Sequence, residues 1–165
     1  MVANMKNVKV QCELVDERAI LPQYAHEGDA CADLRVLVDL GVNKCTWVGK
    51  DGKNKVYVEP NSTVVLDTGI VFKFPKGYGM MIYSRSGLGI KHSVVLANQV
   101  GVIDSKYTET TKIALRNLGK EGFIITDGDR VAQFQVVPYP NMVFEEVKHI
   151  EKTDRGEGLG SSGVK

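Results

Sequence analysis

The chain has 165 residues, the size of one compact domain that can bury a core without disulfides or a structural metal. Its 21 basic and 20 acidic residues give a formal net charge of +1, which argues against direct binding of nucleic acids or membrane surfaces. No apolar stretch approaches the roughly 20 residues of a bilayer span, and the N-terminus lacks the apolar region of a signal peptide.

The three cysteines are Cys12, Cys31 and Cys45. They show no CxxC or Cys/His spacing, which argues against a disulfide framework and against a zinc site. We therefore expect reduced thiols and a cytoplasmic location.

Short segments rich in β-branched and aromatic residues recur along the chain, separated by Gly, Pro, Asn and Asp. They predict strands at 8–15, 56–58, 63–66, 70–74, 79–83, 111–115 and 131–137. Turns are expected at 60–61, 75–77 and 127–129. Closely spaced short strands are typical of sandwiches and barrels, so we predict an all-β fold with a jelly-roll-like arrangement.

Two segments differ from this strand pattern. Residues 43–55, around the only tryptophan, Trp47, predict a hairpin with its turn at 50–53. Residues 154–165 are rich in glycine and poor in apolar side chains, so we expect a flexible C-terminal arm. The expected organisation is one β domain over 1–153, with 43–55 as an inserted hairpin.

Residues 84–89, Ser-Arg-Ser-Gly-Leu-Gly, follow the predicted strand 79–83. Arginine offers a fixed fork of donors to phosphate, serine adds a hydroxyl, and glycines let backbone N–H groups approach an anion. A phosphate cradle is one interpretation, and an ordinary turn is the commoner one. The chain has no Walker-type GxxxxGK[ST] motif, so it is not a P-loop protein.

Asp104 ends an apolar run, and Tyr107 follows it. A carboxylate at a strand end can orient and deprotonate a water, and a tyrosine ring can pack against a flat ligand. The alternatives are an aspartate that caps its own backbone and a half-buried core tyrosine. In the strand after the 128–130 turn, alternation places Gln133 on the face of Val131, where its amide needs a ligand or a backbone partner.

Asp33 lies within an apolar run, so its carboxylate must be paired, hydrogen-bonded or near a cation. No His/Asp/Glu cluster has metal-ligand spacing, which leaves Mg2+ held chiefly by ligand phosphates as the metal mode the sequence permits. In the tail, Arg155, Ser161 and Ser162 with bare backbone amides could wrap an anion, although a disordered terminus is commoner.

Taken in order, five segments resemble the five motifs of the trimeric dUTPase family. They are 30–34 (Ala-Cys-Ala-Asp-Leu), 85–88 (Arg-Ser-Gly-Leu), 101–104 (Gly-Val-Ile-Asp) with Tyr107, 128–133 and 155–163. The resemblance covers nearly the whole chain. It implies Mg2+-assisted hydrolysis of dUTP to dUMP and pyrophosphate, which limits uracil incorporation into DNA and supplies dUMP for dTMP synthesis. It also implies a homotrimer with shared active sites, in the cytoplasm or, for a viral protein, the host-cell cytoplasm.

The resemblance also implies roles for individual residues. Asp104 is expected to activate the water that attacks the α-phosphorus, and Tyr107 to pack on the deoxyribose so that a 2'-hydroxyl would clash. Asn98 and the following hairpin, including Val102, are expected to read uracil. Arg85, Ser86, Gly87 and Gln133 match the family's phosphate-binding residues. Asp33 matches the carboxylate that supports hydrated Mg2+ through water. The expected lid consists of Arg155, Leu159, Gly160, Ser161 and Ser162.

The chain departs from the family pattern at three places. Leu159 replaces the usual aromatic residue of the tail, so it can cover a uracil face but cannot stack on it. Cys31 and Ala32 replace the usual Gly and aromatic or aliphatic residue. Residues 108–110, Thr-Glu-Thr, stand where the family more often has a glycine-containing turn.

Two rival functions remain. A dCTP deaminase shares the family fold but relies on a glutamate at the pyrimidine pocket, whereas this chain has Asp104 in a dUTPase-like context. The other rival is a binding protein that engages a regulatory partner through 43–55, for which a plain surface hairpin is the simpler interpretation.

Overall fold

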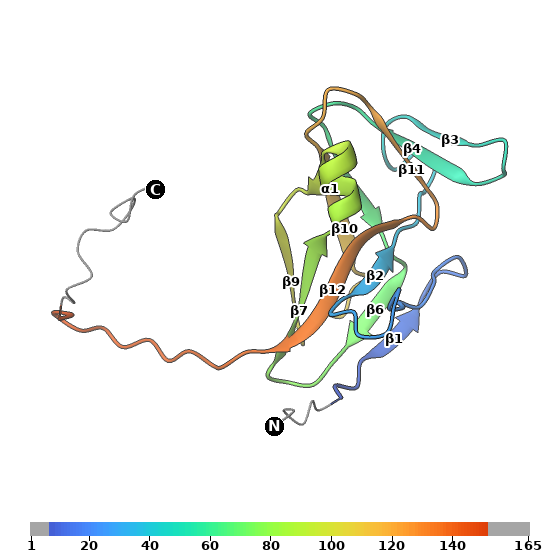
Figure 1. The fold of residues 1–165 in the computed structure, drawn as a ribbon. Helices are drawn as coiled ribbons and strands as arrows, with labels where there is room; N and C mark the ends of the chain where they lie inside the picture. The colour runs from blue at the N-terminus through green and yellow to red at the C-terminus, as the bar shows by residue number, and fades with distance from the viewer. Residues whose placement is uncertain (1–6, 152–165) are drawn as a thin grey trace.

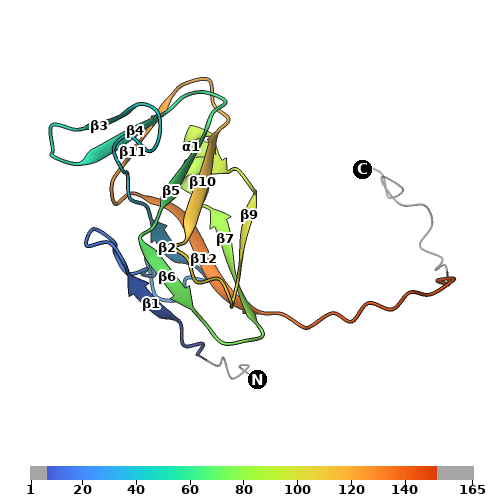
Figure 2. The same ribbon diagram turned by 180° about the vertical axis from the view of Figure 1, so that it is seen from behind.

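A computed structural model describes residues 7–151, and strands dominate them (Figures 1 and 2). The elements in chain order are β1 (Gln11–Leu14), β2 (Ala32–Arg35), β3 (Thr46–Val48), β4 (Asn54–Val58), β5 (Thr63–Asp67), β6 (Ile70–Lys73), β7 (Tyr78–Ser84), α1 (Ser86–His92), β8 (Val94–Leu96), β9 (Val100–Asp104), β10 (Lys112–Asn117), β11 (Phe123–Thr126) and β12 (Arg130–Pro138).

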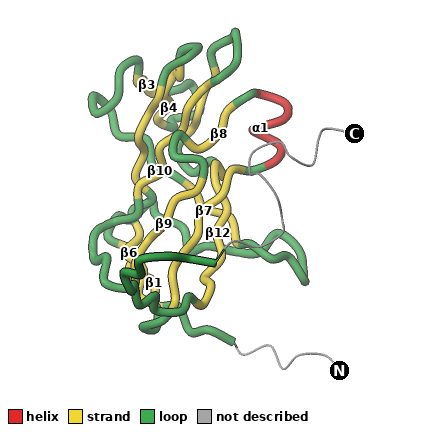
Figure 3. Tube along the Cα trace, turned by 90° about the vertical axis from the view of Figure 1, so that its left-hand side faces the viewer, coloured by secondary structure: helices red, strands yellow, loops and turns green. Residues whose placement is uncertain are grey.

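The strands form antiparallel sheets of four, three, three and two strands, in the orders β2-β12-β7-β9, β5-β10-β8, β11-β4-β3 and β1-β6. Period-two alternation builds the core, because Met80 and Ile82 of β7 point inward while Met81 and Tyr83 are only half-buried. The buried side chains of the sheets join in one hydrophobic cluster. Figure 3 shows this strand-built body with α1 at one side, and the all-β prediction is confirmed.

Each of the seven predicted strands overlaps an observed one, with shifts of up to three residues at the ends. The predicted turns are also present, with positive φ at Asn61, Gly77 and Gly128. In the 43–55 segment, β3 pairs antiparallel with β4, and the Gly49 amide donates to the Lys53 carbonyl across the turn. This hairpin projects from the body in Figures 1 and 2.

A β-bulge in β12 corrects the expected orientation of Gln133. Arg130 pairs with Arg35 of β2, but Ala132 pairs with Leu34, so Val131 is an extra residue on the β12 side. Val131 and Ala132 are both buried, and alternation restarts at Ala132. Gln133 therefore faces away from the core, opposite to the prediction, and its amide donates to the Ser84 carbonyl oxygen at 3.1 Å.

Arg18 forms a clamp that joins three distant segments. Its Nη2 contacts Asp16 at 2.8 Å and Asp39 at 2.7 Å, and its Nη1 contacts Asp127 at 3.3 Å. Hydrogen bonds from Arg18 hold the pKa of Asp16 below its ordinary value, and the bonds to Asp16 and Asp39 raise the pKa of the guanidinium. The clamp ties the N-terminal turn to the start of the β3–β4 region and to the β11–β12 turn.

Beyond β12 the described chain continues to residue 151 as an extended segment that leaves the body (Figure 1). Met142, Val143, Phe144 and Ile150 on this segment are exposed. None of the helices between residues 7 and 151 is long and apolar enough to cross a membrane.

Candidate active site

Asp33 of β2 lies between two guanidinium groups. Its Oδ1 is 2.9 Å from Nε of Arg85, and its Oδ2 is 2.9 Å from Nη1 of Arg130. A third contact closes the ring, because Nη1 of Arg85 donates to the Arg130 carbonyl oxygen at 2.9 Å. The expectation that Asp33 must be paired is therefore confirmed, and the pairing fixes both arginines beside a carboxylate that is 12% exposed.

The three residues come from elements that the four-stranded sheet brings together. Asp33 pairs with Gln133 across β2 and β12, and Gln133 pairs with Tyr83 across β12 and β7. Arg85 directly follows β7 as the residue before α1, with an extended backbone conformation. The segment 86–92 is helical, whereas the sequence predicted only a glycine-containing turn.

A cavity of about 340 Å³ opens beside this cluster. Its walls are Ala25, Asp29, Ala30, Cys31, Asp33, Arg85, Ser86, Gly87 and Gln133. The structure thus brings together five residues that the sequence assigned to phosphate or metal. Burial, and then the charge of Asp29, raise the pKa of the Cys31 thiol, so this cysteine favours its neutral form.

Sequence reasoning gave no role to Arg130. The signal that could have found it is the need of Asp33 for a cationic partner, since Arg130 begins the strand that pairs with β2. Within the described part of the chain, Nη2 of Arg85 and the Nε and Nη2 of Arg130 contact no acceptor. Arg85 lines the cavity described above, whereas Arg130 lines a neighbouring cavity of about 370 Å³ that shares Ala25 and Asp33 with it. The free N–H of Arg85 can therefore bind an anion in the first cavity, and those of Arg130 can bind one in the neighbouring cavity.

Asp104 lies in the same four-stranded sheet as Asp33, and Tyr107 lies in the turn that follows β9. Asp104 is the last residue of β9, the edge strand, and is exposed. The Tyr107 amide donates to the Asp104 carbonyl oxygen at 3.0 Å, which closes a tight turn. Tyr107 lines a second cavity of about 390 Å³, with Cys12, Val71 and Phe72 on its walls.

Asn98 and Val102 precede Asp104, but they do not form the hairpin that the sequence predicted, because β8 pairs with β10 and β9 pairs with β7. Asn98 is exposed in the turn between β8 and β9, where the Val100 amide donates to its carbonyl at 2.7 Å and Gln99 has φ +62°. Val102 points outward from β9 and is exposed. β9 is thus preceded by a polar turn and ends at the Asp104 carboxylate.

Strand register separates Asp104 from the Asp33 cluster. Asp33, Gln133, Tyr83 and Val100 form one row across the four strands, and Asp104 lies four residues further along β9, opposite Gly79. Both carboxylates therefore lie on the same face of the sheet. Three strand spacings across and four residues along put them about 20 Å apart.

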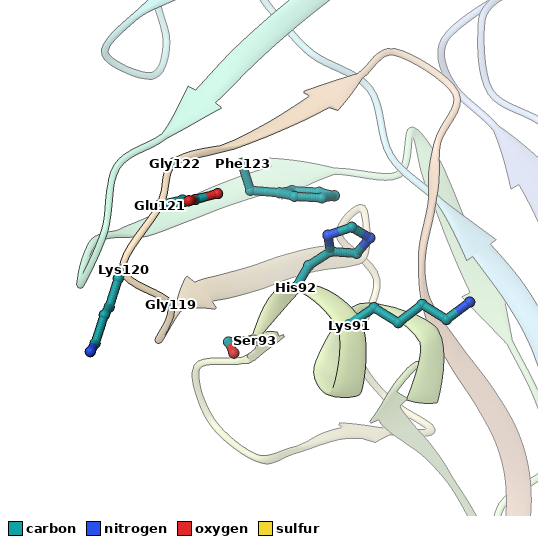
Figure 4. A pocket seen from close by; sticks show the side chains of 8 residues that line it. All are labelled: Lys91, His92, Ser93, Gly119, Lys120, Glu121, Gly122 and Phe123. Atoms are coloured by element: carbon teal, nitrogen blue, oxygen red, sulfur yellow. The ribbon is translucent and has the colours of Figure 1, made fainter.

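A third cavity, of about 300 Å³, lies between the end of α1 and residues 119–123 (Figure 4). None of the predicted site residues lines it. The His92 ring packs on Phe123 with centroids 4.9 Å apart, while Lys91 and Lys120 point away from each other. The lysines therefore do not converge on one ligand.

No group of three or more His, Cys, Asp or Glu side chains that could hold a metal ion occurs among residues 7–151. The predicted lid residues, Arg155, Leu159, Gly160, Ser161 and Ser162, lie outside the described residues.

The sequence matches the dUTPase family over residues 52–163. It is 36% identical to the deoxyuridine 5'-triphosphate nucleotidohydrolase of Acinetobacter baylyi over 164 residues, covering 96% of this chain and 100% of that protein. The fold resembles that of a mutant dUTPase from Staphylococcus bacteriophage 80alpha solved with dUpNHpp, with a TM-score of 0.77, 24% identity and coverage of 94% and 99% of the two chains. It also resembles a mutant dUTPase from phage phi11 of S. aureus, described as coordinating a structural Mg(II) ion, with a TM-score of 0.70, 23% identity and coverage of 87% and 99%.

Proposed function

The chain belongs to the dUTPase family and is a dUTP diphosphatase, and on that basis we propose that it cleaves dUTP by attack of a water, activated by Asp104, on the α-phosphorus. The observation that carries the proposal is the cavity beside the Asp33 cluster, where the Arg85 guanidinium, held by Asp33, shares the lining with Ser86, Gly87 and Gln133. Guanidinium forks fit phosphate oxygens in number and geometry.

The phosphate end of the site stabilises the leaving group. Arg85 is held on its Nε and Nη1 side, so its Nη2 is oriented before a ligand arrives. Donors fixed in advance stabilise charge that develops on a pyrophosphate without the cost of reorganising at that moment. By family resemblance we also assign Arg155, Ser161 and Ser162 to the γ-phosphate, and Leu159 and Gly160 to the cover over uracil.

We assign Tyr107 to the deoxyribose, and Asn98 and Val102 to uracil. These assignments rest on the family resemblance, and the position of all three residues in β9 or in the turns that flank it is consistent with them.

The residues fit Mg2+ that is held mainly by the substrate. Asp33 is a single carboxylate beside the phosphate cavity, and each of its oxygens keeps capacity for a water ligand after its contact with an arginine. Mg2+ commonly keeps several waters and binds through one carboxylate plus substrate phosphates. Bound in this way, the ion would neutralise phosphate charge, and Asp33 would hold its waters.

We further propose that each active site is built from two copies of the chain in a homotrimer. The three phosphates of dUTP are linked by single bridging oxygens, so they cannot bridge the distance of about 20 Å between Asp104 and the Asp33 cluster, which holds Arg85, on the same sheet. A site that uses both residues needs Asp104 from one copy and Arg85 from another. The exposed β9 edge and the apolar segment after β12 offer surface for such an assembly.

The direct test uses purified protein, Mg2+ and each nucleoside triphosphate in turn. We expect pyrophosphate from dUTP and none from dTTP, dCTP or UTP at matched enzyme concentration. Asp104→Asn should lower kcat by at least about 100-fold while dUTP still binds, because the substitution removes the base and little shape. Near-normal turnover in Asp104→Asn would refute its role, and ammonia from dCTP would favour deamination.

Mixed oligomers test the shared site. Asp104→Asn and Arg85→Ala homomers should each be nearly inactive, but co-refolding them at equal amounts should restore about a quarter of the wild-type rate, because a quarter of the sites then combine two intact halves. No recovery would show that both residues serve a site within one copy.

The proposed cellular role is to keep dUTP low and to supply dUMP for dTMP synthesis, and the free cysteines are consistent with a cytoplasmic location. A second role, in binding a regulatory protein, is favoured by the outer face of the β3–β4–β11 sheet, which exposes Trp47, Tyr57 and Ile124. Trp47→Ser should leave dUTP hydrolysis unchanged and abolish capture of such a partner from cell extract. Equal capture by both proteins would exclude the hairpin.

A further inference from the structure

Tyr107 is connected to the body of the protein through two successive hydrogen bonds. Its phenolic oxygen donates to the Thr110 carbonyl oxygen at 3.1 Å. The Thr110 hydroxyl in turn donates to Oδ2 of Asp67 at 2.6 Å. One residue, Thr110, thus holds the tyrosine by its backbone and holds the body by its side chain.

Asp67 is a rigid anchor for this connection. It is the last residue of β5, where it pairs with Lys112 of β10, and its carbonyl oxygen accepts from the Leu37 amide at 2.7 Å. Its second carboxylate oxygen accepts from the Gly69 amide at 2.8 Å. With both carboxylate oxygens and its backbone engaged, Asp67 cannot follow movements of the 105–110 turn.

We propose that Asp67 and Thr110 are positioning residues that lock the Tyr107 ring and so set the discrimination between deoxyribose and ribose. The inference rests on the proposed function, in which Tyr107 packs on the sugar and excludes a 2'-hydroxyl. Steric exclusion of one oxygen atom works only if the ring cannot retreat, because a ring that yields by an ångström admits the extra atom. The Thr110 link supplies that resistance at the phenol end, and the 104–107 turn supplies it at the backbone end.

The same geometry accounts for the unusual 108–110 sequence. Among the residues described, positive φ outside glycine occurs at Cys45, Asn61, Ser93 and Gln99 only, so the turn after Tyr107 does not require glycine. Residues with side chains are therefore tolerated there, and the threonine at 110 contributes a hydroxyl donor that glycine lacks.

The test compares Thr110→Val with Thr110→Ser. Valine keeps the shape and the β-branched backbone preference of threonine but removes the hydroxyl, whereas serine keeps the hydroxyl. We expect the ratio of kcat/KM for dUTP to that for UTP to fall about three- to tenfold in Thr110→Val, mainly through improved use of UTP, because one hydrogen bond to a carboxylate is lost. Thr110→Ser should keep the ratio within about twofold of wild type.

Two further measurements keep the proposal falsifiable. Tyr107→Phe removes only the phenolic oxygen and should lower the ratio to the same extent, and the double variant Tyr107→Phe/Thr110→Val should add little, because both break one chain of bonds. Calorimetric affinities for dUDP and UDP report the same discrimination without turnover, and thermal unfolding confirms that each variant is folded.

A wild-type ratio in folded Thr110→Val, or a loss as large in Thr110→Ser, would overturn the proposal while leaving dUTP hydrolysis intact. A wild-type protein that releases no pyrophosphate from dUTP would instead refute the proposed function. The two failures are therefore distinguishable in one set of assays.

Discussion

Two ion clusters in this molecule have opposite composition. At the Asp33 cluster one carboxylate lies between two arginines, and at the Arg18 clamp one arginine lies among three carboxylates. All the guanidinium nitrogens of Arg18 have partners, including the Val38 carbonyl oxygen. Arg85 and Arg130 keep N–H groups without an acceptor among the residues described, and each lines one of two neighbouring cavities.

Free N–H donors distinguish a binding cluster from a structural one. An arginine whose nitrogens all contact acceptors, and which is surrounded by three carboxylates, has no free donor for an anion. Its contribution is to hold segments of the chain together. An arginine pair that shares one carboxylate keeps net positive charge and oriented donors, which are what a phosphate needs. Substitutions at the first should therefore change stability, and substitutions at the second should change activity.

Arg85→Lys should have the strongest effect of these substitutions, and the effect should be on activity. Lysine keeps the charge but cannot bridge Asp33, the Arg130 carbonyl and a phosphate at the same time. We expect kcat/KM for dUTP to fall by about 10- to 100-fold, with the free energy of unfolding within about 1 kcal/mol of wild type. Arg116→Lys, at an exposed arginine of β10, is the matched control and should leave both quantities unchanged. A large loss of stability with full activity in Arg85→Lys would show that the Asp33 cluster is structural and does not bind the substrate.

Asp33→Asn should lower kcat/KM about tenfold, because an amide holds the two guanidinium groups less firmly than a carboxylate. Titration with Mg2+ adds the second part of the test. If Asp33 also supports the hydrated ion, the Mg2+ concentration for half-maximal activity should rise in the variant. An unchanged Mg2+ requirement would confine Asp33 to the positioning of Arg85 and Arg130.

Arg18→Met should lower stability and leave activity unchanged. Methionine retains apolar bulk but leaves Asp16, Asp39 and Asp127 without their shared cation. Because these groups are partly exposed and solvent screens them, we expect the free energy of unfolding to fall by only about 1 kcal/mol. Denaturant unfolding measures this, and kcat/KM for dUTP should stay within about twofold. Lost activity in a folded Arg18→Met protein would contradict the separation of the two clusters.

A weaker effect is expected of pH on the difference in the free energy of unfolding between wild type and Arg18→Met. The pKa of Asp16 is lowered in the folded chain by its bonds to Arg18, so its stabilisation is present above its ordinary value of 3.8 and is lost as pH falls through the lowered value. The stability gap between wild type and Arg18→Met should therefore be widest near neutral pH and shrink on acidification below about pH 4. A gap that widens in acid would show that the clamp stabilises by some other route.

Sequence patterns predicted the strands in which buried and exposed side chains alternate. The strands now seen as β5, β6 and β7 were predicted because their β-branched and aromatic residues lie between Gly and Pro turns. The helix α1 was not, because its Ser-Gly-Leu-Gly start has low helix propensity and seven residues are too few for a periodic signal. β9 was not among the predicted strands either, since Val100 and Val102 face outward and Gly101 inward, which is the reverse of a core pattern.

The candidate site was partly predictable for a related reason. Residue chemistry indicated that Asp33 needs a partner and that Arg85 could bind phosphate, and motif order connected them. The pairing of Asp33 with Arg130 depends on the contact between β2 and β12, about 97 residues apart in sequence, which no local pattern encodes. The distance of about 20 Å between Asp33 and Asp104 is also not encoded by any local pattern, because it follows from the pairing register of four strands.

The bulge at Val131 gives β12 one residue more than the paired part of β2. Deletion of Val131 would leave Arg130 opposite Arg35 and Ala132 opposite Leu34, so the faces of all the following residues would be kept. Deletion of Phe134 or Gln135 would instead exchange the two faces of the residues that follow, unless the strand slips against β2 and β7. These two deletions should therefore abolish both folding and hydrolysis, whereas deletion of Val131 and deletions in the exposed hairpin turn 50–53 should leave the protein folded. A library of such deletions, scored for soluble protein and for activity, would reveal at which positions β12 tolerates a change of length.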